Sequence, residues 1–278
     1  MIFLLLAIAS SASIAILMRI SSGRISANLS MLAVNYLFCG LLGAAYTGFQ
    51  PALPGQSGFP VTIVLSIVSG ILYLAGFVLC QYNTQRKGIV LTSIFMKLGL
   101  LVPVAMSLLF FREAPTLSQI LGFLIAVFAI VLINLKKGSA ENSFGMSLIL
   151  MLLLCGGCDA MSKVYERLGP PALSDSYLFY TFAAAFVLCA GLVVVKKEKP
   201  GIREFLFGAA IGIPNFFSAK FLLAALTRLP AVVVYPSFSV ATLLVATLAG
   251  VAVFRERLTR RQWLALAAII AALIFLNL

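Results

Sequence analysis

The sequence contains no histidine, only 8 Asp and Glu residues, and only 10% charged residues in a chain of 278. Histidine is the commonest protein ligand of metal ions and titrates nearest to neutral pH, so its absence argues against a metal centre or a histidine proton relay. A soluble domain carries about 25% charged residues. The scarcity of charge therefore excludes an ordinary soluble enzyme and indicates an integral membrane protein.

Nucleotide-binding and acid–base motifs are also missing. No G-x-x-x-x-G-K-[ST] loop occurs, so ATP is not the expected energy source. The carboxylates are scattered mostly over predicted loops, so we expect no enzyme activity, no cofactor and no metal site. Five cysteines lie inside apolar runs, where cysteine acts as a small hydrophobe, and we expect no disulfide framework. They are Cys39, Cys80, Cys155, Cys158 and Cys189.

Apolar residues dominate what is present: 62% of the chain is hydrophobic and the mean hydropathy is +1.12. A helix that spans a bilayer takes about 20 apolar residues. The sequence therefore predicts an all-α polytopic membrane protein with ten transmembrane helices. The expected spans are residues 2–20, 28–48, 60–83, 88–111, 115–135, 144–163, 174–195, 204–226, 230–254 and 259–277.

An internal repeat appears when the chain is aligned with itself at a shift of 143 residues. Residues 111–113 and 254–256 then both read Phe-Arg-Glu, Thr116 aligns with Thr259, and Gln119 aligns with Gln262. Each half holds five spans, and because five is odd the second half must cross the membrane in the opposite sense. We expect two inverted five-helix repeats, residues 1–137 and 138–278, as in secondary transporters that bind solute near the midplane between repeats.

The basic residues predict an orientation. The net charge is +12, and 14 Lys and Arg residues fall in the odd-numbered connections against four in the even-numbered ones, Arg112, Lys163, Arg167 and Arg228. By the positive-inside rule, the odd loops are cytoplasmic and both termini lie outside the inner or plasma membrane. We interpret the basic loops as orientation signals and contacts to membrane lipids, and expect no nucleic acid as a partner.

The most distinctive motif follows the fourth span of each half. An acidic turn precedes a Gln and a final apolar span, with Glu113, Gln119 and Gly122 in the first copy; the second has Glu256 and Gln262, with Ala265 in place of the glycine. With ten spans in two repeats, the whole chain resembles an EamA-type member of the drug/metabolite transporter superfamily. The resemblance implies a permease; similar members export amino acids, take up metabolites or expel drugs. Many ten-helix relatives keep both termini in the cytoplasm, the reverse of the orientation expected here.

Lys97 is the sharpest candidate for a functional residue. It lies about nine residues into the span 88–111, near the middle of a bilayer core of roughly 30 Å. A lysine at that depth costs about 2.5 to 3.5 kcal/mol on insertion scales, so it should face a water-filled cavity or a partner rather than lipid. Its repeat-related position is Val240, which favours a substrate role over a role in the fold. A structural lysine bonded to carbonyls of a neighbouring helix is the alternative.

Other candidates share a position inside a predicted span. Hinge candidates are Pro103, Pro214 and Pro236, which remove helical hydrogen bonds, although each could form a static kink. Further substrate-binding candidates are Ser93, Asn35, Tyr36, Tyr73, Asn215, Tyr235 and Ser239, each with packing or interhelical hydrogen bonding as the alternative. Asp159 precedes Lys163 by four residues, which suits a helical ion pair, or it could bind a proton or a cation. Lys97 and Asp159 are the candidates for coupling.

These patterns favour a secondary active transporter of a small polar solute. An anionic or zwitterionic, amino acid-like metabolite suits a membrane-buried lysine better than a cation does, and proton coupling or exchange is a possible energy source. The first alternative is a multidrug or organic-cation exporter that uses Tyr36, Tyr73 and Tyr235. A lipid-linked flippase and a membrane scaffold are further alternatives. Small-residue helix faces permit a homodimer.

Overall fold

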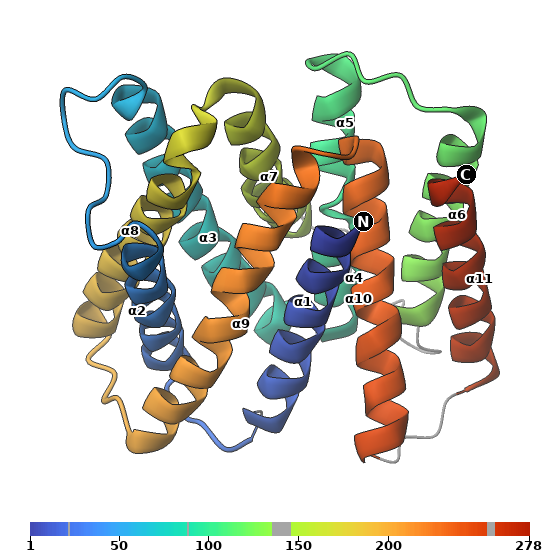
Figure 1. The fold of residues 1–278 in the computed structure, drawn as a ribbon. Coiled ribbons are helices and arrows are strands. Elements are labelled where there is room, and N and C mark those ends of the chain that lie inside the picture. The colour runs from blue at the N-terminus through green and yellow to red at the C-terminus, as the bar shows by residue number, and fades with distance from the viewer. Residues whose placement is uncertain (22, 88, 135–145, 255–258) are drawn as a thin grey trace. The chain divides into compact units, whose positions relative to one another are not determined.

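A computed structural model describes residues 1–21, 23–87, 89–134, 146–254 and 259–278 (Figure 1). Those residues form helices and connecting turns, without a strand. The helices are α1 (Ile2–Ser21), α2 (Asn28–Tyr46), α3 (Phe59–Lys87), α4 (Ile89–Leu98), α5 (Leu101–Leu109), α6 (Leu117–Asn134), α7 (Met146–Leu168), α8 (Ser174–Val195), α9 (Ile202–Leu226), α10 (Ala231–Phe254) and α11 (Arg260–Asn277), with a short 3-10 turn, η1, at Pro171–Leu173.

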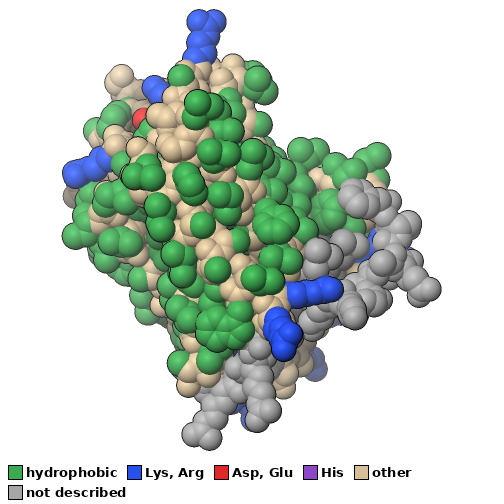
Figure 2. All heavy atoms as spheres, turned by 90° about the vertical axis from the view of Figure 1, so that its right-hand side faces the viewer, with side chains coloured by type: hydrophobic (Ala, Val, Ile, Leu, Met, Phe, Trp, Pro, Cys, Tyr) green, Lys and Arg blue, Asp and Glu red, His purple; other side chains and the backbone are tan. Residues whose placement is uncertain are grey.

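The helices have the length and composition of membrane spans. In the described ranges, nine stretches are long and apolar enough to cross a bilayer, and a tenth apolar helix covers Leu117–Leu132. Hydrophobic side chains cover most of the face that Figure 2 shows, from the side of α6 and α11, and few Lys and Arg side chains appear on it. A lipid-facing surface has this composition, because hydrocarbon cannot solvate charge. The predicted all-α polytopic membrane fold is confirmed.

One predicted span is broken into two helices. We expected residues 88–111 to form one span, but α4 ends at Leu98 and α5 begins at Leu101. Pro103 has no N–H with which to bond the carbonyl of Gly99. The Val102 N–H donates to that carbonyl instead, at 2.9 Å, in a tighter turn. The proline predicted as a hinge thus lies just after an interruption of the helix.

The helix bounds repeat along the chain. Adding 143 to the limits of α6 gives residues 260–277, the limits of α11. Both helices begin with the same hydrogen-bonded cap: the backbone N–H of Gln119 donates to Thr116 Oγ1, and the backbone N–H of Gln262 donates to Thr259 Oγ1. In return, Thr116 N–H and Thr259 N–H donate to the Gln side chains at 3.2 and 2.8 Å. The repeated Thr and Gln are therefore helix caps.

The chain divides into two compact units. Unit 1 consists of Met1–Leu74 and Val164–Thr227, and within it α2 packs against α8 and α9 while α1 packs against α9. Unit 2 consists of Ala75–Lys163 and Arg228–Leu278; there α11 packs against α6, and α10 packs against α5, α6 and α11. Each unit combines helices from the two halves of the sequence.

Glycines allow α2 and α9 of unit 1 to approach closely. A Cβ added to Gly208 would lie 2.6 Å from the carbonyl oxygen of Met31, and one added to Gly212 would lie 2.7 Å from that of Asn35. No side chain fits at either place, so the two glycines, four residues apart, form the contact face of α9.

Candidate functional site

Lys97 lies in the last turn of α4, directly before the interrupted part of the span. The carbonyl groups at a helix C-terminus carry partial negative charge and stabilise a cation there. The interruption packs against α7 of the same unit, since a Cβ on Gly99 would lie 3.1 Å from the Gly156 nitrogen. Asp159 is three residues, nearly one helical turn, beyond Gly156. The glycine contact therefore brings the end of α4 close to the carboxylate of α7.

Lys97 and Asp159 form a separated pair of opposite charges. The two groups interact electrostatically. Within the part of the chain that the structure describes, neither side chain has a direct ion pair or hydrogen bond, so the attraction acts across a gap. The Lys97 side chain is half-buried and that of Asp159 is exposed. The sequence predicted each residue alone, but not that the two would interact.

Tyr235 joins this pair through the backbone of α7. Its hydroxyl donates a hydrogen bond of 2.8 Å to the carbonyl oxygen of Asp159, and its side chain is only 2% exposed. Tyr235 immediately precedes Pro236, yet α10 continues through that proline. Ser93, one turn before Lys97, and Ser239, one turn after Tyr235, are both half-buried. Lys97, Asp159 and Tyr235 are the candidate site of unit 2.

Four other predicted residues come together in unit 1. The Asn215 side-chain amide donates to Asn35 Oδ1 at 3.2 Å, which joins α9 to α2 beside Pro214. Tyr36 and Tyr73 meet edge to face, with ring centroids 6.1 Å apart. Both tyrosines also pack on Phe182, at 6.4 and 5.7 Å. Unit 1 thus holds an aromatic cluster, Tyr36–Tyr73–Phe182, and α9 again runs unbroken through its proline.

Glu113 is a second charged centre of unit 2, in the connection between α5 and α6. Its carboxylate lies 2.9 Å from Lys163 Nζ of α7 and accepts hydrogen bonds from Ser107 Oγ and, at 2.9 Å, from the N–H of Ala231, the first residue of α10. The side chains of Lys163 and Glu113 are 3% and 9% exposed. Burial pulls the pKa of Glu113 upward, but its hydrogen bonds from Ser107, Lys163 and Ala231 outweigh burial and hold the pKa below its usual value.

Comparisons with known proteins decide the family. The EamA-like transporter family matches residues 1–135 and again residues 144–278. The chain belongs to the EamA-like transporter family. An uncharacterized protein of Haemophilus influenzae is 21% identical over 97% of this chain and 95% of its own length. A protein of known crystal structure, 16% identical, superposes with a TM-score of 0.73 over 99% of this chain and 94% of that chain. At that identity, the crystal structure supports the fold alone.

In this EamA-like chain, the residues of the repeated motif have structural contacts. Gln119 and Gln262 cap the last helix of each half, and Glu113 ties the end of α5 to α7 and to the beginning of α10. Gly122 packs on α11, where an added Cβ would lie 2.8 Å from the Leu276 nitrogen. Glu256, the second acidic motif residue, lies outside the described residues, as do Lys136, Lys137, Arg255 and Arg257.

The sequence did not predict two of the ion pairs in this EamA-like protein. Lys163 contacts Glu113, whereas we expected it to pair with Asp159 one turn away. Lys220 of α9 lies 2.5 Å from Asp175 Oδ1 and 3.7 Å from the centre of the Tyr46 ring. The helical spacing that suggested the Asp159–Lys163 pair was a local signal, and both observed partners lie far away in sequence.

Proposed function

We propose that this EamA-like protein is a secondary active transporter of a small zwitterionic, amino acid-like solute. The separated charges of Lys97 and Asp159 carry the proposal, because they offer a cationic and an anionic partner on neighbouring helices. A solute carboxylate would bind Lys97 and a solute ammonium would bind Asp159. A solute with only one of the two charges would leave the other protein charge without a partner, which is costly away from water.

Alternating access between two inverted five-helix repeats, residues 1–137 and 138–278, is the proposed mechanism. The interruption between α4 and α5 supports it, because broken helices are where transporters of this kind bind solutes and bend. Lys97 lies in the last turn before this break, so movement of α4 against α5 would change its distance from Asp159. Pro214 and Pro236 lie in unbroken helices, where a missing hydrogen bond still eases bending.

Coupling is proposed to use the same two charges. When the solute leaves, Lys97 and Asp159 interact only with each other across the site. Either group can then exchange a proton with water. The charge asymmetry of the loops further supports a cytoplasmic location for the odd-numbered connections, with both termini outside.

A second function is favoured by the aromatic cluster of unit 1. Tyr36, Tyr73 and Phe182 pack face and edge against one another, and aromatic rings bind lipophilic cations. An organic-cation exporter would use this cluster and would not need Lys97.

A panel of matched ligands tests the proposal. The purified protein is heated with a neutral amino acid, with its amide, which lacks the carboxylate, and with its N-acetyl derivative, which lacks the ammonium. We expect the amino acid to raise the melting temperature most, since a ligand that binds the folded state stabilises it by mass action. Stabilisation by quaternary amines alone, with no response to any amino acid, would support the exporter instead.

A further inference from the structure

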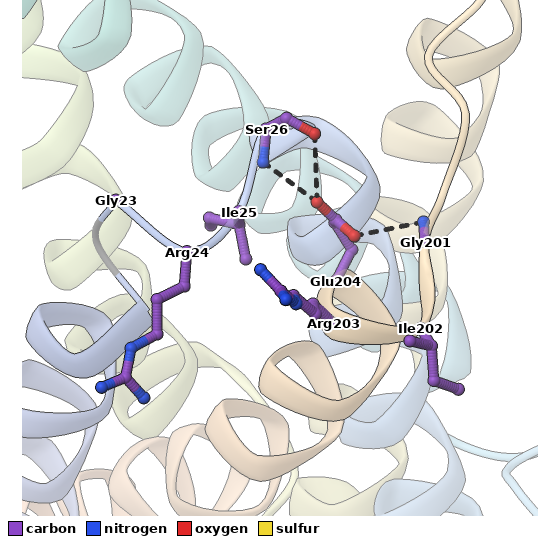
Figure 3. A pocket seen from close by; sticks show the side chains of 8 residues that line it. All are labelled: Gly23, Arg24, Ile25, Ser26, Gly201, Ile202, Arg203 and Glu204. Carbon is purple, nitrogen blue, oxygen red and sulfur yellow. Dashed lines mark hydrogen bonds between the residues drawn. The ribbon is translucent and has the colours of Figure 1, made fainter.

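A pocket of about 460 Å³ lies in unit 1, and none of the charged residues discussed so far lines it. Two short segments line it, residues 23–26 before α2 and residues 201–204 at the beginning of α9 (Figure 3). Arg24 and Arg203 contribute one guanidinium group from each segment, and both side chains are exposed. In the described ranges, neither arginine has an ion pair with a protein carboxylate.

The carboxylate in the pocket wall is already engaged by protein donors. Glu204 accepts hydrogen bonds from the N–H of Ser26 at 3.0 Å, of Ala27 at 3.4 Å and of Gly201 at 3.2 Å. Figure 3 shows its carboxylate directed to Ser26 and Gly201, while the Arg24 side chain extends away from it. Glu204 thus serves the N-termini of α2 and α9, where a carboxylate is stabilised. Its position leaves the two guanidinium groups for an external anion.

A second carboxylate at this end of unit 1 is engaged in the same way. Glu198 Oε2 accepts hydrogen bonds from the N–H and the hydroxyl of Ser30, at 3.0 and 3.1 Å. The remaining charges of the connection between α8 and α9 are basic: Lys196, Lys197 and Lys199. The surroundings of the pocket are therefore cationic, and they attract phosphate groups.

An apolar strip leads from the pocket along α9. Ile202, which lines the pocket, is 72% exposed, and Phe205 and Leu206 are 44% and 60% exposed. Residues at i, i+3 and i+4 lie on one face of a helix, so these side chains form a continuous surface. A ligand that fits both features carries an anionic head and hydrocarbon chains.

We propose that this pocket binds the phosphate group of an anionic glycerophospholipid, with Arg24 and Arg203 as its cationic contacts. The acyl chains lie along Ile202, Phe205 and Leu206. Guanidinium groups suit this role because their planar donors pair with phosphate oxygens. The loops that line the pocket belong to the side predicted to be cytoplasmic, where anionic lipids are concentrated.

The test compares lipids on matched variants. The protein is prepared in detergent micelles that contain either phosphatidylcholine as the only lipid or phosphatidylcholine mixed with phosphatidylglycerol. The melting temperature is measured in each, and native mass spectrometry counts the lipids that the protein retains. We expect phosphatidylglycerol to raise the melting temperature of the wild type. In the double variant Arg24→Gln, Arg203→Gln, most of that increase should be lost, and the protein should retain one lipid fewer than the wild type. In phosphatidylcholine alone, the variant should have the same melting temperature as the wild type, because the side chains of Arg24 and Arg203 are exposed.

The control variant is Lys196→Gln, Lys199→Gln, which removes the same charge from the same end of unit 1 without changing a residue of the pocket. This control should keep the increase in melting temperature that phosphatidylglycerol produces, and it should retain as many lipids as the wild type. An equal loss in both variants would overturn the proposal in favour of general attraction to the basic loops. A shift produced equally by inorganic phosphate, or no response to phosphatidylglycerol in the wild type, would overturn it as well.

Discussion

Replacement of Lys97 by methionine is expected to weaken binding of a zwitterionic solute by roughly 100-fold while the protein stays folded. Once a bound solute covers Lys97, loss of this charge from its pair with the solute carboxylate costs about 2 to 5 kcal/mol of binding, and 2.7 kcal/mol is about 100-fold. Stability should not fall, because Lys97 has no direct ion pair with Asp159 to lose and its burial is itself unfavourable. Calorimetric titration together with a melting curve measures both quantities.

Asp159→Asn gives the complementary expectation. Lys97→Met should retain binding of the amino acid amide, whose ammonium still meets Asp159. Asp159→Asn should retain binding of the N-acetyl derivative, whose carboxylate still meets Lys97. This crossed change in specificity would not arise if either residue had only a structural role.

Lys220→Met is the matched control, since Lys220 also lies inside a predicted span, 204–226. Lys220 is paired with Asp175 and lies over the Tyr46 ring in unit 1. Its replacement should therefore lower the free energy of unfolding and leave the affinity for solute within about twofold of the wild-type value. Unchanged affinity in Lys97→Met, or an equal loss in both lysine variants, would contradict the assignment of Lys97 to the site.

Glu113→Gln is expected to lower the free energy of unfolding by about 3 to 5 kcal/mol, because it breaks a buried ion pair by removing the carboxylate that contacts Lys163. Adding Lys163→Met should recover part of the loss, since removing both charges is less costly than removing one. Glu166→Gln is the control: its 3.6 Å contact with Arg167 is more exposed, and such pairs contribute about 0 to 1 kcal/mol. Chemical unfolding in detergent compares the variants, and a loss below about 1 kcal/mol in Glu113→Gln would refute a structural role.

The same carboxylate should give a pH dependence at the acidic end. The folded-state pKa of Glu113 lies below its usual value of about 4.3, so its contribution to stability is complete above that value and is lost as the pH falls through the lower, folded-state pKa. The difference in stability between the wild type and Glu113→Gln should therefore be constant from pH 7 to about 5 and should narrow only below about pH 4. A difference that disappears between pH 7 and 5 would show that another group is responsible.

Spans were the easiest feature to predict from the sequence, because membrane burial imposes about 20 apolar residues on each one. The expected limits 174–195 are those of α8, and other helices differ by a few residues. The break after Leu98 was predicted only as a weakness at Pro103. A proline removes a hydrogen bond wherever it lies, but whether the helix then bends or stops depends on packing, here between Gly99 and Gly156.

The partners of the charged residues were the hardest to predict. The depth of Lys97 in its span singled it out, whereas its neighbour Asp159 is 62 residues away, on a helix whose contact with α4 no local pattern encodes. Glu113 was evident as a motif residue, but its three partners lie at 107, 163 and 231. The Thr and Gln caps are different: both members lie three residues apart, so their pattern alone indicates the contact.

Counterflow in proteoliposomes tests the proposed transport most directly. Vesicles that contain the wild-type protein are loaded with an unlabelled neutral amino acid and diluted into a trace of the labelled compound, without ATP. A carrier that alternates between two access states predicts transient accumulation of label above its outside concentration, and predicts that Lys97→Met abolishes it. The zwitterion site would be contradicted if the wild type accumulated no labelled zwitterion but showed counterflow of a quaternary amine, and if Lys97→Met left that counterflow unchanged.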